Sequence, residues 1–217
     1  EPIPFFGELG SVNPMFLLPN ALNTRGKEIG VGWAGALSMG AGQFCTNPGI
    51  AVVIEGADAM EFITAATEAL GDIGAQTMLT DGIARAYRDG RDRIRSSAGI
   101  QEVLTSTCDL RNATPYLFMT TGTEWMANAE LGEEVFGPLG MIVQVKDFEE
   151  MLTVAKSLQG QLTCTLHMDA ADVDQGLALL PILERKAGRI LANGFPTGVE
   201  VCDSMVHGGP YPASTNF

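Results

Sequence analysis

Short apolar runs without polar alternation are the feature that most restricts how this 217-residue chain can fold. Strands that are buried on both faces have this pattern, and longer segments with helical periodicity separate the runs. The sequence therefore predicts an α/β fold, with a largely parallel sheet and helices on both of its faces. The predicted strands are 15–19 ("MFLLP"), 49–55, 102–107, 116–120, 140–145, 162–168 and 189–193.

Helices are predicted between these strands, and some carry start or stop signals. Asp58 with Glu61, and Asp147 with Glu150, have the spacing of a capping box. Gly71 is a stop signal for the first of these two helices. The predicted helices are 25–43, from Asp58 to Gly71, 83–94, 147–158 and 172–187, the last interrupted at Pro181.

Residues 29–54 contain no charged side chain and therefore resemble a membrane span. Six of these residues are glycine, and Gln43, Asn47 and Pro48 interrupt the stretch. A spanning helix would be most apolar at those positions, so the stretch is predicted to be buried structure of a globular domain.

Composition excludes several classes of partner. The chain has 26 acidic and 13 basic residues, for a formal net charge of −13, which disfavours nucleic acid and anionic lipid. Its four cysteines are widely spaced and have no metal-ligand spacing with histidine, so no metal site is predicted. Ten methionines and the lack of a signal-like start predict a reduced, cytoplasmic protein.

Three residues are candidates for chemistry, and each has a plainer alternative. Cys45, in "GAGQFCTNPG", is a potential nucleophile or a small buried side chain. Glu8, in "FFGELGS", is a potential general base if its surroundings are apolar, or an exposed turn residue. Glu134, in "GEEVFGPLG", is a potential binding carboxylate or a solvated loop residue.

The two histidines allow a cysteine–histidine hydrolase as another hypothesis. His167 lies in an apolar strand pattern that favours a core histidine with satisfied hydrogen bonds. His207 lies in the loop sequence "VHGGPYP", whose position the pattern leaves open. No Gly-rich phosphate loop follows any predicted strand, so a nucleotide-binding half is expected outside this chain.

The order and spacing of three motifs resemble the aldehyde dehydrogenase superfamily. They are "ELG" at 8–10, "GQFCT" at 42–46 and "EVFGP" at 134–138, with 37 residues from Glu8 to Cys45 and 89 from Cys45 to Glu134. The forms "ELGSVNP", "GQFCTNPG" and "HGGPYPAS" are most similar to the branch that oxidises α-ketoglutaric semialdehyde and related or fatty aldehydes.

The resemblance implies a role for each motif. Cys45 would attack the aldehyde carbonyl, and Glu8 would activate the water that hydrolyses the resulting thioester. Glu134 would hold the ribose of NADP or NAD, Phe136 would pack against the nicotinamide, and the Leu9 carbonyl would help to place the carboxamide. The substrate implied is a small-molecule aldehyde, which is oxidised to a carboxylic acid.

The resemblance also bears on substrate contacts and domain organisation. Phe195 would line the aldehyde tunnel, with simple loop packing as the alternative. Residues 1–217 would be the catalytic domain alone, without the nucleotide-binding domain and the C-terminal oligomerisation segment of a homo-oligomeric parent. The missing part would include one oxyanion-hole donor, worth about 3 kcal/mol, so the isolated chain is expected to be nearly inactive. A cysteine hydrolase or acyltransferase, and a non-catalytic assembly domain, remain as alternatives.

Overall fold

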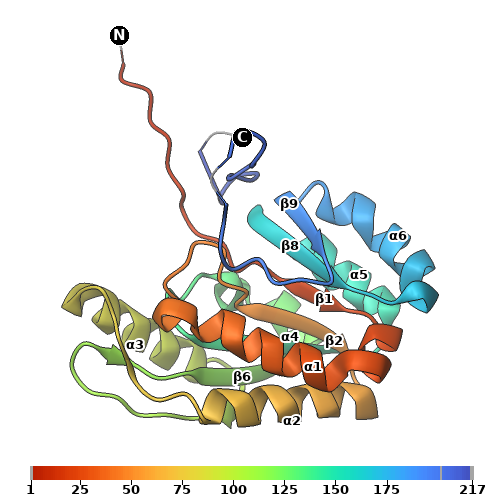
Figure 1. Ribbon diagram of the computed structural model, residues 1–217, viewed down its shortest axis with the longest axis horizontal. Helices are drawn as coiled ribbons and strands as arrows, with labels where there is room; N and C mark the ends of the chain where they lie inside the picture. Colours follow the sequence, from red (N-terminus) through yellow and green to blue (C-terminus); the bar gives the residue numbers. More distant parts are fainter. Residues whose placement is uncertain (1, 201, 216–217) are drawn as a thin grey trace.

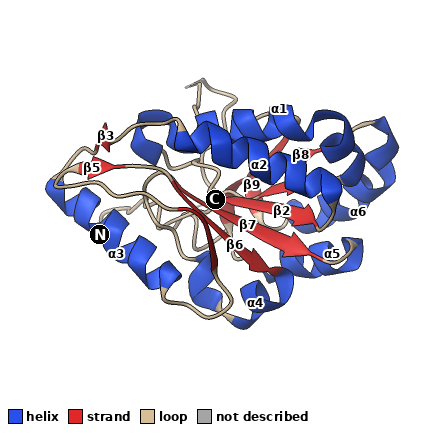
Figure 2. Ribbon diagram, turned by 90° about the horizontal axis from the view of Figure 1, so that it is seen from below, coloured by secondary structure: helices blue, strands red, loops and turns tan. Residues whose placement is uncertain are grey.

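The computed structural model, which describes residues 2–200 and 202–215, is built around a twisted seven-stranded sheet (Figures 1 and 2). The strand order is β4-β6-β7-β2-β1-β8-β9, and all neighbours are parallel except the edge pair β4–β6. The predicted largely parallel sheet is therefore confirmed. The strands are β1 (Met15–Leu17), β2 (Ile50–Ile54), β4 (Gln101–Leu104), β6 (Tyr116–Thr121), β7 (Leu139–Val145), β8 (Gln161–His167) and β9 (Ala187–Ala192).

Helices cover both faces of this sheet, as predicted. Figure 2 shows α1 and α2 on one side and α4 and α5 on the other. The helices are α1 (Pro19–Ser38), α2 (Ala57–Gly71), α3 (Asp81–Arg95), α4 (Gly122–Ala127), α5 (Phe148–Ser157) and α6 (Val173–Leu183), with 3-10 turns η1 (Met39–Gly42), η2 (Ala129–Gly132) and η3 (Ala170–Asp172). The short α4 and the separate two-stranded antiparallel sheet of β3 (Gln76–Thr77) and β5 (Asn112–Ala113) were not predicted.

Strand β1 shows why the predicted strands lack alternation. Met15 and Leu17 point into one hydrophobic core, which they share with α1 and α2. Phe16 points into the other core, which also contains side chains of α3, α4, α5 and α6. Both faces of the strand are therefore apolar.

The uncharged stretch 29–54 is divided among α1, η1, a turn and β2. Its glycines allow close helix packing: a Cβ on Gly30 would lie 2.7 Å from the Phe62 carbonyl oxygen of α2. The Trp33 indole is buried between the layers and donates a hydrogen bond of 2.7 Å to the Pro48 carbonyl. Within residues 2–200 and 202–215, none of the helices combines the length and apolar character needed to cross a membrane.

The predicted boundaries of α1 were wrong at both ends. The helix begins at Pro19, a residue whose fixed φ suits the first helical turn, rather than at residue 25. It ends at Ser38 because the backbone becomes left-handed at Gly40 and Ala41, both with φ of 58°.

The predicted helix caps were partly right. Asp147 caps α5, with its carboxylate accepting the Glu150 N–H at 2.9 Å, but the Glu150 carboxylate binds the Lys146 N–H and does not complete a box. Helix α2 begins at Ala57 after Gly56 without a side-chain cap, so the predicted box at Asp58 is wrong.

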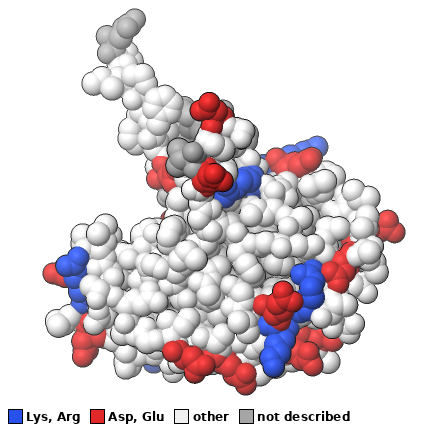
Figure 3. Space-filling model, viewed as in Figure 1, with Lys and Arg blue, Asp and Glu red and all other residues white. Residues whose placement is uncertain are grey.

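One further prediction needs correction. Pro181 lies within α6, which continues to Leu183, so the proline does not interrupt the helix. The segment before β1 is extended and forms an isolated bridge between Glu8 and Ser214. Figures 1 and 3 show its beginning standing away from the body, and on the face drawn in Figure 3 the charged side chains are scattered in small groups.

Candidate active site

The three motif segments meet at the amino ends of neighbouring parallel strands. Glu8 precedes β1, Cys45 precedes β2 and Glu134 precedes β7, and the order β7-β2-β1 makes these strands neighbours. Together they form a cavity of about 300 Å³, called the site cavity below, which contains five of the predicted site residues. It is lined by Glu8, Leu9, Gly10, Ser11, Cys45, Glu134, Phe136 and Leu162.

Glycines in the motifs permit the close approach of these segments. Gly42 has φ of +67°, and a Cβ there would lie 2.2 Å from the carbonyl carbon of Gly137. Gly10 has φ of +136°, and a Cβ there would lie 3.2 Å from Oε2 of Glu134. A larger residue at Gly42 would therefore separate the cysteine motif from the "EVFGP" motif.

Asn13 holds the cysteine loop in place, a role that the sequence reasoning missed. The fully buried side chain donates to the carbonyls of Cys45 and Asn47, both at 2.9 Å. Its oxygen accepts from Thr163 N and Oγ1 of β8 at 3.2 and 3.0 Å. Its φ of 45° is left-handed, which asparagine tolerates better than most residues. The sequence signal available for this role was the pair Asn13–Pro14, directly before β1.

Gln161 fixes the neighbouring backbone at the start of β8. Its Oε1 accepts hydrogen bonds from Val12 N at 2.8 Å, Asn13 N at 3.0 Å and Ser11 Oγ at 3.0 Å. The segment that follows Glu8 is thereby attached to the sheet through a buried side chain.

His207 is the second residue that the sequence reasoning did not place at the site. Its Nε2 lies 2.7 Å from Glu8 Oε1 and 3.3 Å from Cys45 Sγ. Pairing of residues 7–9 with 213–215, including Leu9 N to Ala213 O at 3.2 Å, holds the two chain segments together. The Glu8 side chain is 40% exposed and lies within hydrogen-bond distance of His207, so the apolar surroundings expected for it are not found.

The Cys45 thiol is partly buried in the turn before β2. Burial raises its pKa above 9.0, the charge of Glu8 raises it further, and the backbone N–H groups of Thr46 and Cys45 oppose these effects. The thiol form therefore predominates at neutral pH in the chain as it stands.

Glu134 keeps part of its surface exposed, but its carboxyl group is largely surrounded by protein. Loss of hydration raises the pKa of this carboxyl to about 7, against a lowering contribution from the Ser11 backbone N–H, while the Glu8 charge adds to the rise. The carboxyl group therefore ionises near neutral pH.

Phe195 and His167 lie away from the site cavity lining. The Phe195 ring packs against Gly32 of α1 and lies 5.2 Å from the His167 ring, the arrangement of the packing alternative. His167 is buried as predicted, but neither ring nitrogen has a well-formed hydrogen bond among the described residues. Burial, assisted by the charge of Arg25, lowers the pKa of His167 to about 4.

The site also groups three potential metal ligands, which the spacing of cysteines and histidines did not predict. Glu8, Cys45 and His207 each contribute one ligand atom, and these three atoms lie within 4.8 Å of one another. The other cysteines, Cys108, Cys164 and Cys202, are free thiols outside this group.

This parallel α/β sheet, with a cysteine, two glutamates and a phenylalanine around one cavity, has the fold of part of several solved aldehyde dehydrogenases. One similar solved structure is that of an NADP-dependent glyceraldehyde-3-phosphate dehydrogenase from Bacillus halodurans in complex with NADP. The match covers 99% of this chain and 44% of that chain, with a TM-score of 0.79 at 18% sequence identity. No family model matches the chain.

Sequence relatives make the assignment more specific and confirm the resemblance to the aldehyde dehydrogenase superfamily. The whole chain is 46% identical to alpha-ketoglutaric semialdehyde dehydrogenase 2 of Azospirillum brasilense. It is 40% identical to the alpha-ketoglutaric semialdehyde dehydrogenase of Acinetobacter baylyi. In both comparisons it spans 42% of the relative's length. The chain is a homologue of that part of an aldehyde dehydrogenase.

Proposed function

We propose that this chain supplies the nucleophile and the general base for NAD(P)-dependent oxidation of an aldehyde to a carboxylic acid. The observation that carries the proposal is that Cys45, Glu8, Glu134 and Phe136 line one cavity. The names of the two relatives make α-ketoglutaric semialdehyde the first substrate to test.

The residues present suit the nicotinamide end of the cofactor. An ionised Glu134 offers acceptors for ribose hydroxyl groups, and the absence of a side chain at Gly10 leaves room beside its Oε2. Phe136 offers an apolar ring surface in the same cavity, and the Leu9 carbonyl would help to place the carboxamide. When bound, the nicotinamide would accept a hydride from the reacting carbon. NADP and NAD remain equal candidates.

Cys45 and Glu8 would perform the two proton-coupled steps. Cys45 Sγ adds to the aldehyde carbon, and its proton is transferred to the carbonyl oxygen to give a thiohemiacetal. Loss of hydride from that carbon, with loss of the hydroxyl proton, leaves a thioester on Cys45. Glu8 then takes a proton from water as the water oxygen attacks. The C–S bond breaks, and Glu8 returns this proton to the departing Cys45 sulfur, which leaves the thiol and the carboxylic acid.

The chain alone is proposed to lack measurable hydride transfer. Its relatives are more than twice as long, and the resemblance assigns the adenosine-binding part and one oxyanion donor to that additional length. The homo-oligomeric state of the parent, the cytoplasmic location and a tunnel role for Phe195 stay predictions.

Acyl transfer tests the nucleophile and the base without any nucleotide. A p-nitrophenyl ester of a short carboxylic acid is mixed with the chain, and acyl-peptides are followed by mass spectrometry. We expect a transient acyl group on Cys45 and none in Cys45→Ser. Glu8→Gln should prolong the lifetime of the acyl group by about 100-fold or more, because water activation is lost.

Cys202 provides the matched control for this experiment. It is exposed, and hydrogen bonds from Ser204 lower its pKa, so it is a competing reactive thiol. Cys202→Ser should leave acylation at Cys45 unchanged. If the label resides on Cys202 alone, or if Glu8→Gln does not prolong the acyl group, the assigned roles fail and the assembly-domain alternative gains support.

A cysteine hydrolase is a second candidate, favoured by the 3.3 Å approach of His207 Nε2 to Cys45 Sγ. In that case the chain would turn over many esters without nucleotide, and Glu134→Gln would have no effect. For a dehydrogenase, Glu134→Gln should weaken reduction of NAD(P) in the protein extended to the length of its relatives. The two readouts therefore separate the candidates.

A further inference from the structure

Three different ligand atoms converge on one point at the rim of the site cavity. His207 Nε2 lies 3.3 Å from Cys45 Sγ and 2.7 Å from Glu8 Oε1, and all three atoms lie within 4.8 Å of one another. The same imidazole nitrogen therefore faces both the sulfur and the carboxylate.

This shared nitrogen differs from the arrangement of a proton relay. In a nucleophile–histidine–carboxylate relay, one ring nitrogen faces the nucleophile and the other faces the carboxylate. Here Glu8 and Cys45 compete for Nε2. A metal cation in place of the shared proton can instead bind the Cys45 sulfur, the His207 nitrogen and the Glu8 oxygen at the same time.

One of the three ligand-atom distances is already close to that of a tetrahedral zinc site. Zn²⁺ binds sulfur at about 2.3 Å and nitrogen or oxygen at about 2.0–2.2 Å, which places neighbouring ligand atoms about 3.4–3.7 Å apart. The sulfur–nitrogen distance of 3.3 Å is close to this range, and the shorter nitrogen–oxygen distance needs to increase. The His207 and Glu8 side chains are 31% and 40% exposed and lie on segments outside helices and strands, so they are able to move by that amount.

The geometry points to Glu8, Cys45 and His207 as a binding site for a thiophilic divalent cation, with Zn²⁺ as the best match. The thiol proton of Cys45 is released to solvent as the zinc–sulfur bond forms, and the adjoining cavity leaves the fourth coordination position to water. The metal would cover the nucleophile, so occupancy should block acyl transfer. This inhibitory consequence rests on the proposed function, whereas binding itself does not.

A direct titration with Zn²⁺ in competition with a chromophoric chelator tests binding in the full 217-residue chain. We expect one Zn²⁺ per chain, and Co²⁺ in its place should show thiolate-to-metal charge-transfer absorption. Cys45→Ser and His207→Ala should each weaken Zn²⁺ binding by more than about 100-fold, since loss of an outer-shell partner alone costs about 10- to 100-fold.

The controls use the other histidine and an exposed thiol outside the cluster. His167→Gln and Cys202→Ser should bind Zn²⁺ as the unaltered chain does, and circular dichroism should show that every variant is folded. Binding that survives both Cys45→Ser and His207→Ala, or a Co²⁺ complex without thiolate absorption, would overturn the site. Binding that depends on Cys45 and His207 but leaves ester acylation unaffected would uphold the metal site and reject the catalytic role of Cys45.

Discussion

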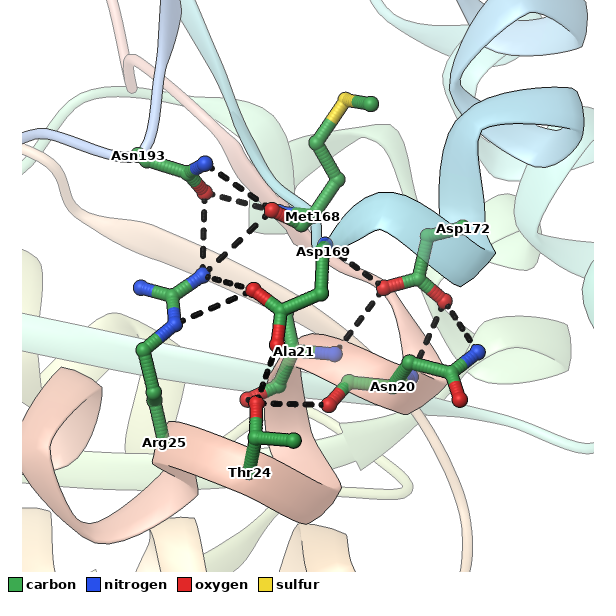
Figure 4. A network of polar contacts seen from close by, with 8 residues as sticks. All are labelled: Asn20, Ala21, Thr24, Arg25, Met168, Asp169, Asp172 and Asn193. Carbon is green, nitrogen blue, oxygen red and sulfur yellow. Dashed lines mark hydrogen bonds and ion pairs between the residues drawn. The ribbon is translucent and has the colours of Figure 1, made fainter.

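The polar groups at the carboxyl ends of the parallel strands (the carboxyl edge) and those at the amino ends (the amino edge) are arranged in opposite ways. At the carboxyl ends of β1, β8 and β9, acceptors are matched to donors in one network (Figure 4), called the carboxyl-edge network below. Its residues are Asn20, Ala21, Thr24, Arg25, Met168, Asp169, Asp172 and Asn193. At the amino ends of β1, β2 and β7, Glu8, Cys45 and His207 instead converge on one point.

Asp172 is the centre of the carboxyl-edge network and shows what complete pairing achieves. It is 1% exposed, and its carboxylate accepts the N–H groups of Asn20, Ala21 and Asp169, each at 2.9 Å. Two of these donors are the otherwise unpaired N–H groups at the start of α1, where Pro19 already removes one. Arg25 pairs with Asp169 at 2.8 Å and completes the network.

The comparison indicates where ligand chemistry can occur. Open α/β sheets often bind ligands at the carboxyl ends of their strands. In this chain the network binds α1 to β8 and β9 there, whereas the amino edge holds the cavity and the convergent side chains. The carboxyl-edge network therefore lies at one edge and the site cavity at the other, and this division can be tested.

Substitution of Asp172 should have the largest effect on stability. Asp172→Ala leaves buried N–H donors without an acceptor, which should cost about 4 kcal/mol of the free energy of unfolding, measured with urea. Acylation of Cys45 should be unchanged while the protein is folded. Asp174→Ala, at an exposed position of α6, is the control and should cost less than about 1 kcal/mol. A large loss of acylation in folded Asp172→Ala would show that the two edges are coupled.

Asn13 should affect both stability and reactivity, because it is a buried network residue at the reactive edge. Asn13→Ala removes the bonds to the Cys45 and Asn47 carbonyls and places alanine at φ of 45°. We expect a loss of about 3 kcal/mol in unfolding free energy and slower acylation of Cys45.

Asn13→Gly separates the two contributions. Glycine accepts the left-handed backbone but lacks the amide, so about 1 kcal/mol of stability should return while acylation stays slow. Full recovery of acylation in Asn13→Gly would show that backbone strain matters and the amide bonds do not.

His167 is the exception at the carboxyl edge, since its buried ring lacks well-formed hydrogen bonds among the described residues. Its pKa of about 4 lies below 6.5, the ordinary value for histidine. The unfolded chain therefore binds more protons between these values, and stability falls as pH decreases from about 6.5 to 4. Unfolding free energy should decrease by about 2 kcal/mol from pH 7 to pH 5 through this residue.

His167→Leu tests that contribution by removing the titrating group. The pH dependence in this range should become shallower by the same amount. An identical acid dependence in His167→Leu would assign the effect to other groups.

The sequence predicted the class of fold because the strands are apolar on both faces, as β1 shows with Met15, Phe16 and Leu17. Glu8, Leu9, Cys45, Glu134 and Phe136 were named from motifs that resemble a known family, and the structure places them around one cavity. The strand order remained unknown, since nothing local specifies that β1 lies between β2 and β8.

That missing information explains which residues were overlooked. His207 meets Cys45 across 162 positions, near the pairing of residues 7–9 with 213–215. Asn13 meets Thr163 across 150 positions, a contact that depends on the strand order. Asp172 accepts the N–H of Asn20, 152 positions earlier in the first turn of α1, through the same strand order. Local capping patterns cannot reveal a cap that is provided by a distant segment, just as the pattern at Asp58 indicated one that does not form.

Glu134 provides the test with the smallest expected effect in the comparison of the two edges. Its pKa is raised by the surrounding protein, whereas the pKa of His167 is lowered, so the two groups change stability in opposite directions with pH. The pKa of Glu134 is raised from 4.5 to about 7, so the folded state binds more protons between these values and loses stability as pH rises through them. Partial exposure makes this contribution small, so carboxyl-carbon NMR of the Glu134 resonance is the appropriate measurement. A midpoint near 7 is expected, and Glu134→Gln identifies the resonance by its loss. Glu8→Gln should lower the midpoint because it removes a neighbouring negative charge. An unchanged midpoint would mean that the charge of Glu8 does not affect the ionisation of Glu134.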